Sequence, residues 1–142
     1  MNQISLPYHL LIPSLISIVV LIMLILNRKK PLANRKWKWF WIGATVFFGI
    51  YLLIVAGATY LDISYKLALQ RFDLNNDGFF TNDEITTRQK EVMRKVISDT
   101  GRNFAPITGL ILSGFMSLIV LIVGKTTHYI SSKKIKITSS DV

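Results

Sequence analysis

Three long runs without any charged residue constrain the fold of this chain more than any other feature. They cover residues 10–26, 40–61 and 104–124, and the first run lengthens when Tyr8 and His9 are added. A helix needs roughly 20 consecutive apolar residues to cross the hydrocarbon of a bilayer. Because 51% of the 142 residues are hydrophobic and they gather in these runs, we expect an all-α membrane protein with three transmembrane helices.

The first run has an alternative explanation, a cleavable signal peptide. Such peptides begin with basic residues and place a shorter apolar core before a cleavage site of small residues. Residues 1–6 carry no charge, and the nearest basic cluster follows the run, beginning at Arg28. The first run is therefore predicted to be an anchor that stays in the protein.

Lysine and arginine collect beside the ends of the apolar runs. They are Arg28, Lys29, Lys30, Arg35, Lys36 and Lys38 in the first link, and Lys125, Lys133, Lys134 and Lys136 after the third run. Residues 62–103 hold seven basic and seven acidic residues over a longer stretch. Since short basic links remain in the cytoplasm, residues 28–39 and 125–142 are predicted to be cytoplasmic, with the N-terminus and 62–103 outside.

The same basic residues favour lipid over nucleic acid as the partner of this chain, whose net charge is +9. Each Lys or Arg near a membrane surface contributes about 1 kcal/mol to the attraction toward anionic headgroups. Trp37, Trp39 and Trp41 stand at the same edge, and their amphipathic rings favour the headgroup layer. We expect anionic headgroups near residues 28–38; the simpler alternative is that these charges only set the topology.

Residues 73–84 carry the strongest chemical signal in the chain. Oxygen-bearing side chains stand at the first, third, fifth, ninth and twelfth places of this segment, and a glycine stands at the sixth. In chain order these residues are Asp73, Asn75, Asp77, Gly78, Thr81 and Glu84. This spacing is typical of a short loop that surrounds a hard cation with oxygen atoms, with the glycine at a sharp turn.

On these residues, the segment 61–97 resembles the EF-hand family of calcium-binding helix-loop-helix units. The resemblance implies calcium as the cofactor. It also implies a ligand set: side-chain oxygens of Asp73, Asn75 and Asp77, the backbone carbonyl of Phe79, Thr81 directly or through a water, and both carboxylate oxygens of Glu84. Phe80 fits the apolar eighth place, which in this family forms a short strand with a neighbouring loop.

The ligand set has one unusual member, and the loop has one alternative interpretation. Asn75 replaces a carboxylate, which leaves Asp73, Asp77 and Glu84 as the charged ligands and favours a weaker affinity. A plain polar loop is the alternative, with Thr81 and Glu84 forming a capping box for the following helix. The two interpretations are compatible.

Apolar residues recur at helical spacing on both sides of the loop. They are Leu61, Tyr65, Ala68, Leu69 and Phe72 before it, and Ile85, Val92, Met93, Val96 and Ile97 after it. Nothing breaks the pattern between the second run and the loop, so we expect one helix over residues 40–72, about 50 Å long. Residues 99–103 predict a break before the third span. A single EF-hand leaves its stripes to be covered by another copy, a different subunit, the first span or the membrane surface.

Small residues are candidates for contacts between the spans, since helices in lipid associate through close packing. Gly109, Ser113 and Ser117 recur every four residues on one helix face. Gly49 and residues 56–59 offer a less regular surface on the second span. Contacts within the chain and contacts with a partner both remain open.

Several classes of chemistry are missing from the sequence. There is no cysteine, which excludes disulfides and thiolate sites, and the two histidines, His9 and His128, are predicted on opposite sides of the membrane. The spans lack the charged residues that mark an ion pathway. No catalytic residue is identified, and the chain is predicted to be neither an enzyme nor a self-contained transporter.

The expected organisation follows the chain in six segments. They are the first transmembrane helix (1–27), a basic cytoplasmic loop (28–39), the second helix (40–61), an extracytoplasmic EF-hand (62–103), the third helix (104–124) and a basic cytoplasmic tail (125–142). We expect a small membrane subunit, a homo-oligomer or part of a larger complex, in which calcium stabilises a helical hairpin for docking. The alternative is a calcium sensor that regulates an associated channel, transporter or enzyme.

Overall fold

The computed structural model describes residues 6–33, 37–75, 78–81, 84–97 and 100–138. Its helices are α1 (Tyr8–Leu26), α2 (Lys29–Ala33), α3 (Lys38–Gln70), α4 (Thr87–Ile97), α5 (Thr100–Asn103) and α6 (Ala105–Thr138). No strand occurs in these described ranges. Three helices are long and apolar enough to cross a membrane, over Tyr8–Leu26, Lys38–Gln70 and Ala105–Ile130. The all-α class and the three membrane-length helices are therefore confirmed.

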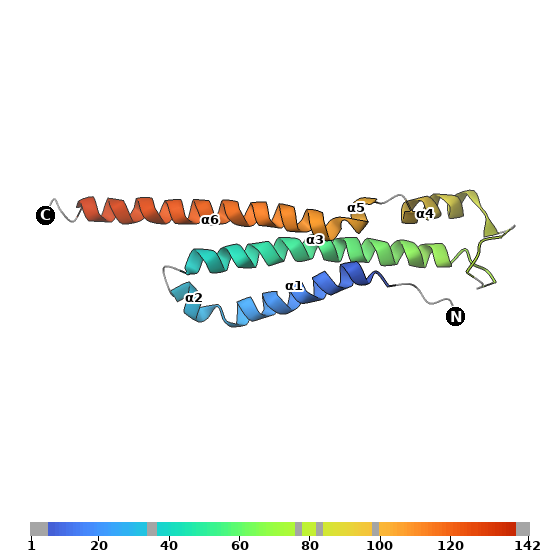
Figure 1. The fold of residues 1–142 in the computed structure, drawn as a ribbon, viewed down its shortest axis with the longest axis horizontal. Helices are drawn as coiled ribbons and strands as arrows, with labels where there is room; N and C mark the ends of the chain where they lie inside the picture. Colours follow the sequence, from blue (N-terminus) through green and yellow to red (C-terminus); the bar gives the residue numbers. More distant parts are fainter. Residues whose placement is uncertain (1–5, 34–36, 76–77, 82–83, 98–99, 139–142) are drawn as a thin grey trace.

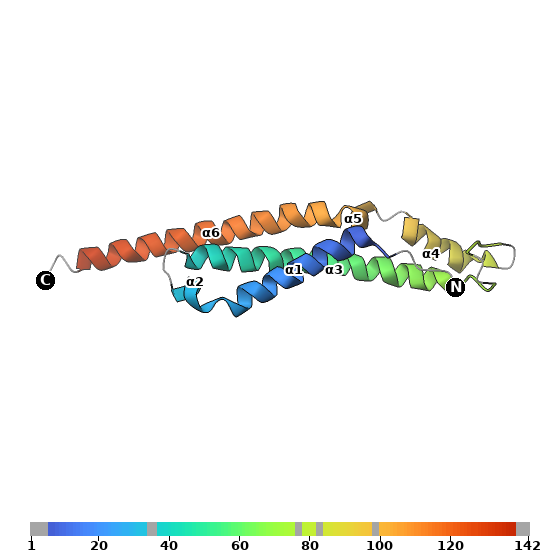
Figure 2. The same cartoon turned by 60° about the horizontal axis from the view of Figure 1, so that its bottom comes forward.

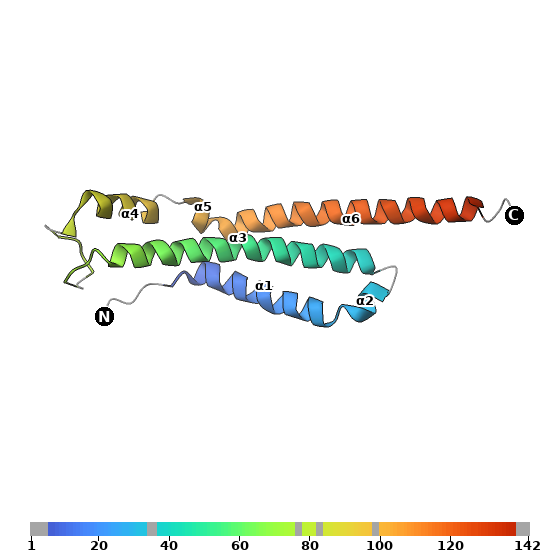
Figure 3. The ribbon, with the colours of Figure 1, turned by 180° about the vertical axis from the view of Figure 1, so that it is seen from behind.

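Helix α3 is the centre of the molecule. Both α1 and α6 pack along it, whereas α1 and α6 contact each other much less (Figures 1 and 2). The short helix α2 joins α1 to α3 at one end, and α4 folds back beside the other end of α3 (Figure 3). Every other helix is thus positioned by its contact with α3.

α3 runs without interruption from the second apolar run into the helix that precedes the loop. Its 33 residues correspond to about 50 Å at the standard helical rise. The segment contains no proline, and an internal glycine costs only about 1 kcal/mol relative to alanine. The prediction of one continuous helix is confirmed, which places the loop at the far end of a rigid rod.

A small apolar core joins the three long helices near the middle of α3. Leu10 from α1 and Ala105 from α6 are buried against Tyr51, Val55 and Ala58 of α3. These three α3 residues are spaced by four and three positions and so share one helix face. Most remaining apolar side chains of the long helices are exposed, as expected for surfaces that contact lipid.

The predicted small residues of the third span face α3 within the same chain. A Cβ added to Gly109 would lie 3.2 Å from the Tyr51 ring, and Ser113 is fully buried. The Ser117 hydroxyl donates a 2.9 Å hydrogen bond to the carbonyl of Gly43. Small residues therefore allow the α3 and α6 backbones to approach closely, and a side-chain hydrogen bond adds to the contact.

The glycines of α3 that make close contacts with another helix are not the ones predicted from the sequence. Gly49 and Gly57 have no side chain or neighbouring helix within 4 Å of an added Cβ. Gly43 takes the close-contact role instead, because a Cβ there would lie 2.9 Å from Leu121 Cγ. Which glycines are needed depends on how α3 is rotated about its axis, and span composition does not define that rotation.

α6 extends beyond the apolar run. The sequence predicts that the third span ends at Gly124, but the helix continues to Thr138. A single glycine is a weak interruption, and no proline follows it. The hydroxyls of Thr126 and Thr127 donate to carbonyls one turn earlier, at 2.8 and 2.9 Å, and so stay compatible with the helix.

A buried ion pair joins the loop region to the spans. Arg102 of α5 is 4% exposed and Asp62 of α3 is 5% exposed, and Arg102 Nε lies 3.5 Å from Asp62 Oδ1. Arg102 Nη2 also donates to the Lys95 and Val96 carbonyls at the end of α4, at 3.3 and 2.9 Å. Its guanidinium lies 5.2 Å from the centroid of the Tyr65 ring. One side chain thus connects α3, α4 and α5.

The substitution Gly43→Leu should destabilise the protein relative to Gly57→Leu. Both changes remove a helix glycine, but only the side chain at residue 43 collides with α6. Overpacking of this kind costs about 1–3 kcal/mol. Thermal unfolding of the two variants in one detergent measures the difference, and equal midpoints would contradict the α3–α6 contact.

Removing one partner of the buried ion pair should cost far more than removing one partner of an exposed pair. Asp62→Ala leaves the Arg102 charge buried and also removes the 2.8 Å ion pair of Asp62 with Lys66, so a loss of about 3–5 kcal/mol is expected. The matched control is Glu91→Ala, whose partner Lys95 is more than half exposed at 54%, and it should change stability by about 0.5 kcal/mol or less. Denaturation in detergent compares the two, and similar losses would argue against a structural role for Asp62.

Candidate metal centre

The loop 73–84 connects the end of α3 to α4, at the opposite end of α3 from α2 (Figure 1). The chain leaves α3 through a tight turn, in which the N–H groups of Phe72 and Asp73 donate to the carbonyls of Leu69 and Gln70 at 3.0 and 3.2 Å. These bonds cap the last turn of α3. They also place Asp73 at the entrance of the loop, where it is buried.

The carboxylate of Glu84 draws both sides of the loop together. Its Oε1 accepts hydrogen bonds from the backbone N–H groups of Leu74 (2.8 Å) and Asn75 (3.2 Å). Its Oε2 accepts from the N–H of Thr81 at 3.1 Å. The side chain is only 6% exposed. The last residue of the predicted ligand set is thus bonded to the backbone near the first ones.

The carboxylate of Asp73 also turns into the loop. Its Oδ2 accepts a 3.0 Å hydrogen bond from the N–H of Gly78. Gly78 has φ 86°, in the left-handed region that residues with a Cβ rarely adopt. The predicted sharp turn at the sixth place is confirmed, and glycine is required there because of the backbone conformation.

The predicted ligands are brought together in part. Backbone hydrogen bonds to Glu84 gather Asn75 and Thr81 around it. Asp77 lies outside the described residues. Across the described ranges, no three His, Cys, Asp or Glu side chains converge on one point, and of the three predicted carboxylates these ranges include only Asp73 and Glu84. The EF-hand assignment and its ligand set remain a prediction.

The residues present fit a hard cation. Buried charged groups in proteins are normally paired with an opposite charge or bound to a metal. Glu84 is buried, and none of the described Lys, Arg and His side chains forms an ion pair with it. Within the described residues, the Glu84 carboxylate accepts hydrogen bonds from three backbone N–H groups. Together with the oxygens of Asp73, Asn75 and Thr81, Glu84 provides the donor type that calcium prefers.

The residue that caps the N-terminus of α4 is not Thr81, which the capping-box alternative suggests. The Thr86 hydroxyl accepts a 3.1 Å hydrogen bond from the N–H of Gln89, and the Thr86 carbonyl accepts from Lys90. Thr86 therefore caps α4. The spacing Thr86-x-x-Gln89 is itself a capping-box signature that would have located the start of this helix. The Glu84 carboxylate is consequently used within the loop.

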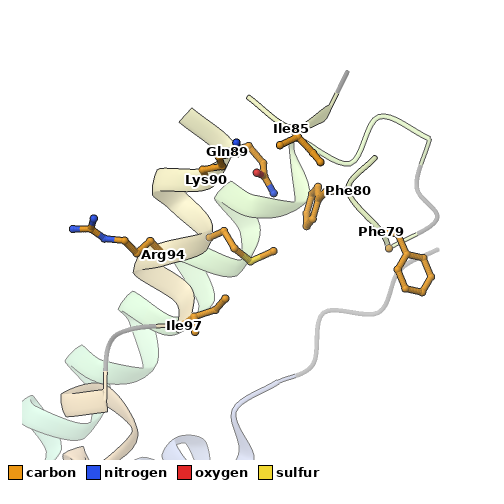
Figure 4. A pocket seen from close by; sticks show the side chains of 9 residues that line it. Phe79, Phe80, Ile85, Gln89, Lys90, Arg94 and Ile97 are labelled. Carbon is orange, nitrogen blue, oxygen red and sulfur yellow. The ribbon is translucent and has the colours of Figure 1, made fainter. Parts of the chain in front are cut away.

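An apolar groove of about 690 Å³ lies between the loop and α4. Figure 4 shows Phe80, Ile85 and Gln89 close together at its upper end and Ile97 at its lower end. The polar rim is basic, formed by Lys90 and Arg94 of α4. Part of the predicted apolar stripe of α4 therefore lines a groove that no described part of the chain fills.

Comparison of the chain with protein-family models, with curated proteins and with solved structures finds no match. The observations that bear on the chemistry of the loop are two buried carboxylates, a glycine with positive φ and the hydrogen bonds that join the ends of the loop.

Proposed function

We propose that this chain is a small integral membrane subunit in which calcium, bound by the 73–84 loop, stabilises the α3–α4 hairpin for docking in a membrane complex. One observation carries the proposal, the buried Glu84 carboxylate bonded to the backbone at both sides of the loop. A cation at this position would neutralise a charge that is costly to bury.

The residues of the chain have separate roles in this proposal. Asp73, Asn75, Thr81 and Glu84, with Asp77 and the carbonyl of Phe79, would supply the oxygen ligands. When bound, calcium supplies positive charge and favours one loop conformation. Gly78 provides the turn. Because Glu84 is only three residues before α4, its position in the loop determines how α4 leaves the loop.

The apolar groove supports a docking role. It is open in the single chain, and Phe79 and Ile97 at its edges are 72% and 71% exposed. Exposed apolar surface of this kind favours burial against another protein. A second membrane subunit, either another copy or a different chain, would cover the groove once calcium has ordered the loop.

The side of the membrane that the loop faces distinguishes two versions of the proposal. The distribution of Lys and Arg favours a loop outside the cytoplasm. Extracellular modules bind calcium with Kd of about 0.1–1 mM, so a site there would stay filled and calcium would act as a structural component. A loop in the cytoplasm would instead favour the calcium sensor.

Calcium should raise the thermal unfolding midpoint of the purified protein. A ligand that binds only the folded state stabilises it by about 2.7 kcal/mol at 100 times Kd. Glu84→Gln retains the side-chain shape but removes the charge, so it should remove most of the shift between calcium and chelator. Glu91→Gln, at an exposed carboxylate of α4, should leave the shift unchanged.

Magnesium at the same concentration should shift the midpoint less than calcium does, because magnesium requires a smaller octahedral site. The absence of any calcium shift in the wild type, or an equal shift in both glutamate variants, would remove calcium from the proposal.

Single cysteines report the topology without background, since the chain has no cysteine. Leu74→Cys places the thiol at a side chain that is 72% exposed in the loop, and Ala33→Cys places it on the exposed surface of α2. A membrane-impermeant maleimide added to intact cells should label the first variant only. Labelling of the second variant alone would overturn the structural version and support the sensor.

A further inference from the structure

A second, smaller cleft is lined by residues of α1, α2 and α3 near the α2 end of α3. The backbones of α1 and α3 diverge toward α2 at this end (Figures 1 and 3). Its volume is about 250 Å³. Leu24 of α1, Leu32 of α2 and Val46 of α3 contribute apolar walls. The residues that line it come from α1, α2, α3 and the turn between α1 and α2.

The two neutral polar side chains that line this cleft both bond to the backbone. The indole N–H of Trp41 donates to the carbonyl of Leu24 at 3.1 Å, which links α3 to α1. The hydroxyl of Thr45 donates to the carbonyl of Trp41 at 2.9 Å. Because both neutral polar side chains in the lining already donate to the backbone, the cleft favours an apolar occupant.

One charged side chain stands at the cleft. Arg28 is exposed and lies in the turn between α1 and α2. The first 61 residues of the chain contain no Asp or Glu, although six Lys and Arg lie within residues 28–38. Among the described residues, Arg28 forms no ion pair with a carboxylate. Arg28 is therefore open to an anionic ligand.

We propose that the cleft binds an anionic phospholipid, with part of one acyl chain between α1 and α3 and the headgroup phosphate on Arg28. The cleft lies at the ends of two membrane-length helices and beside Trp41, at the level where headgroups meet hydrocarbon. Pockets that enclose whole small molecules measure about 300–1,000 Å³. A cleft below this range fits a chain segment whose remainder stays in the bilayer.

A net negative headgroup is favoured because every charged residue among the first 61 is basic. Any phospholipid carries a phosphate that Arg28 can bind, but a zwitterionic headgroup also brings a positive group into a cluster of Lys and Arg. The guanidinium forms paired hydrogen bonds to phosphate oxygens, which a general attraction to the membrane surface does not require. The inference is independent of calcium and of the proposed function.

The test uses the full-length protein in detergent and native mass spectrometry, with phosphatidylglycerol and phosphatidylcholine of identical acyl chains. The wild type should retain one phosphatidylglycerol in preference to phosphatidylcholine. Arg28→Gln should weaken this retention about tenfold, the change expected when one charge-assisted contact is lost. Lys38→Gln removes an equal charge from the same basic segment but does not line the cleft, so it should retain the lipid as the wild type does.

A second variant tests the apolar part of the site. Val46→Phe fills the cleft from α3 and should lower the retention of the lipid while Arg28 is unchanged. Equal losses in the Arg28 and Lys38 variants, or equal retention of the two lipids, would replace the site with a diffuse attraction to headgroups. A lipid-free dimer that Val46→Phe dissociates would place a second copy in the cleft and overturn the proposal.

Discussion

The close approach of α3 and α6 is the contact on which the other elements depend. Apolar side chains gain little by leaving lipid for a helix interface, so packing and hydrogen bonds hold such helices together. Here Gly43 lies against Leu121, and Ser117 donates to the Gly43 carbonyl. α3 also packs against α1 and continues to the loop. The α3–α6 contact therefore gives the whole molecule a rigid central element.

Different interactions stabilise the two ends of the α3–α4 hairpin, its base beside α5 and its tip at the 73–84 loop. At the base, Arg102 binds Asp62 of α3 and the last carbonyls of α4. At the tip, Glu84 and Asp73 fold the loop by accepting backbone hydrogen bonds. The base is already neutralised by an ion pair, whereas the tip concentrates negative charge. A cation therefore has an electrostatic reason to bind at the tip.

Acidic residues are distributed unevenly along the chain. Seven of the eight acidic residues lie in residues 62–99, and none lies in the first 61. The α2 end instead combines Arg28 with an apolar cleft. α3 separates these ends by about the thickness of a membrane. We infer that the carboxylates of the loop recognise a cation and that Arg28 at the α2 end recognises an anionic lipid.

Features encoded by neighbouring residues were determined by the sequence alone: three apolar helices, the uninterrupted α3 and the turn at Gly78, since composition and short spacing define them. Only the tertiary structure decided that Gly43 packs against α6 while Gly57 does not, and that Asp62 meets Arg102. These contacts depend on how each helix is rotated and on residues that are 40 positions apart (Asp62 and Arg102) or 78 positions apart (Gly43 and Leu121). Such choices follow from the fit of side chains in three dimensions, and they leave no periodic signal in a single sequence.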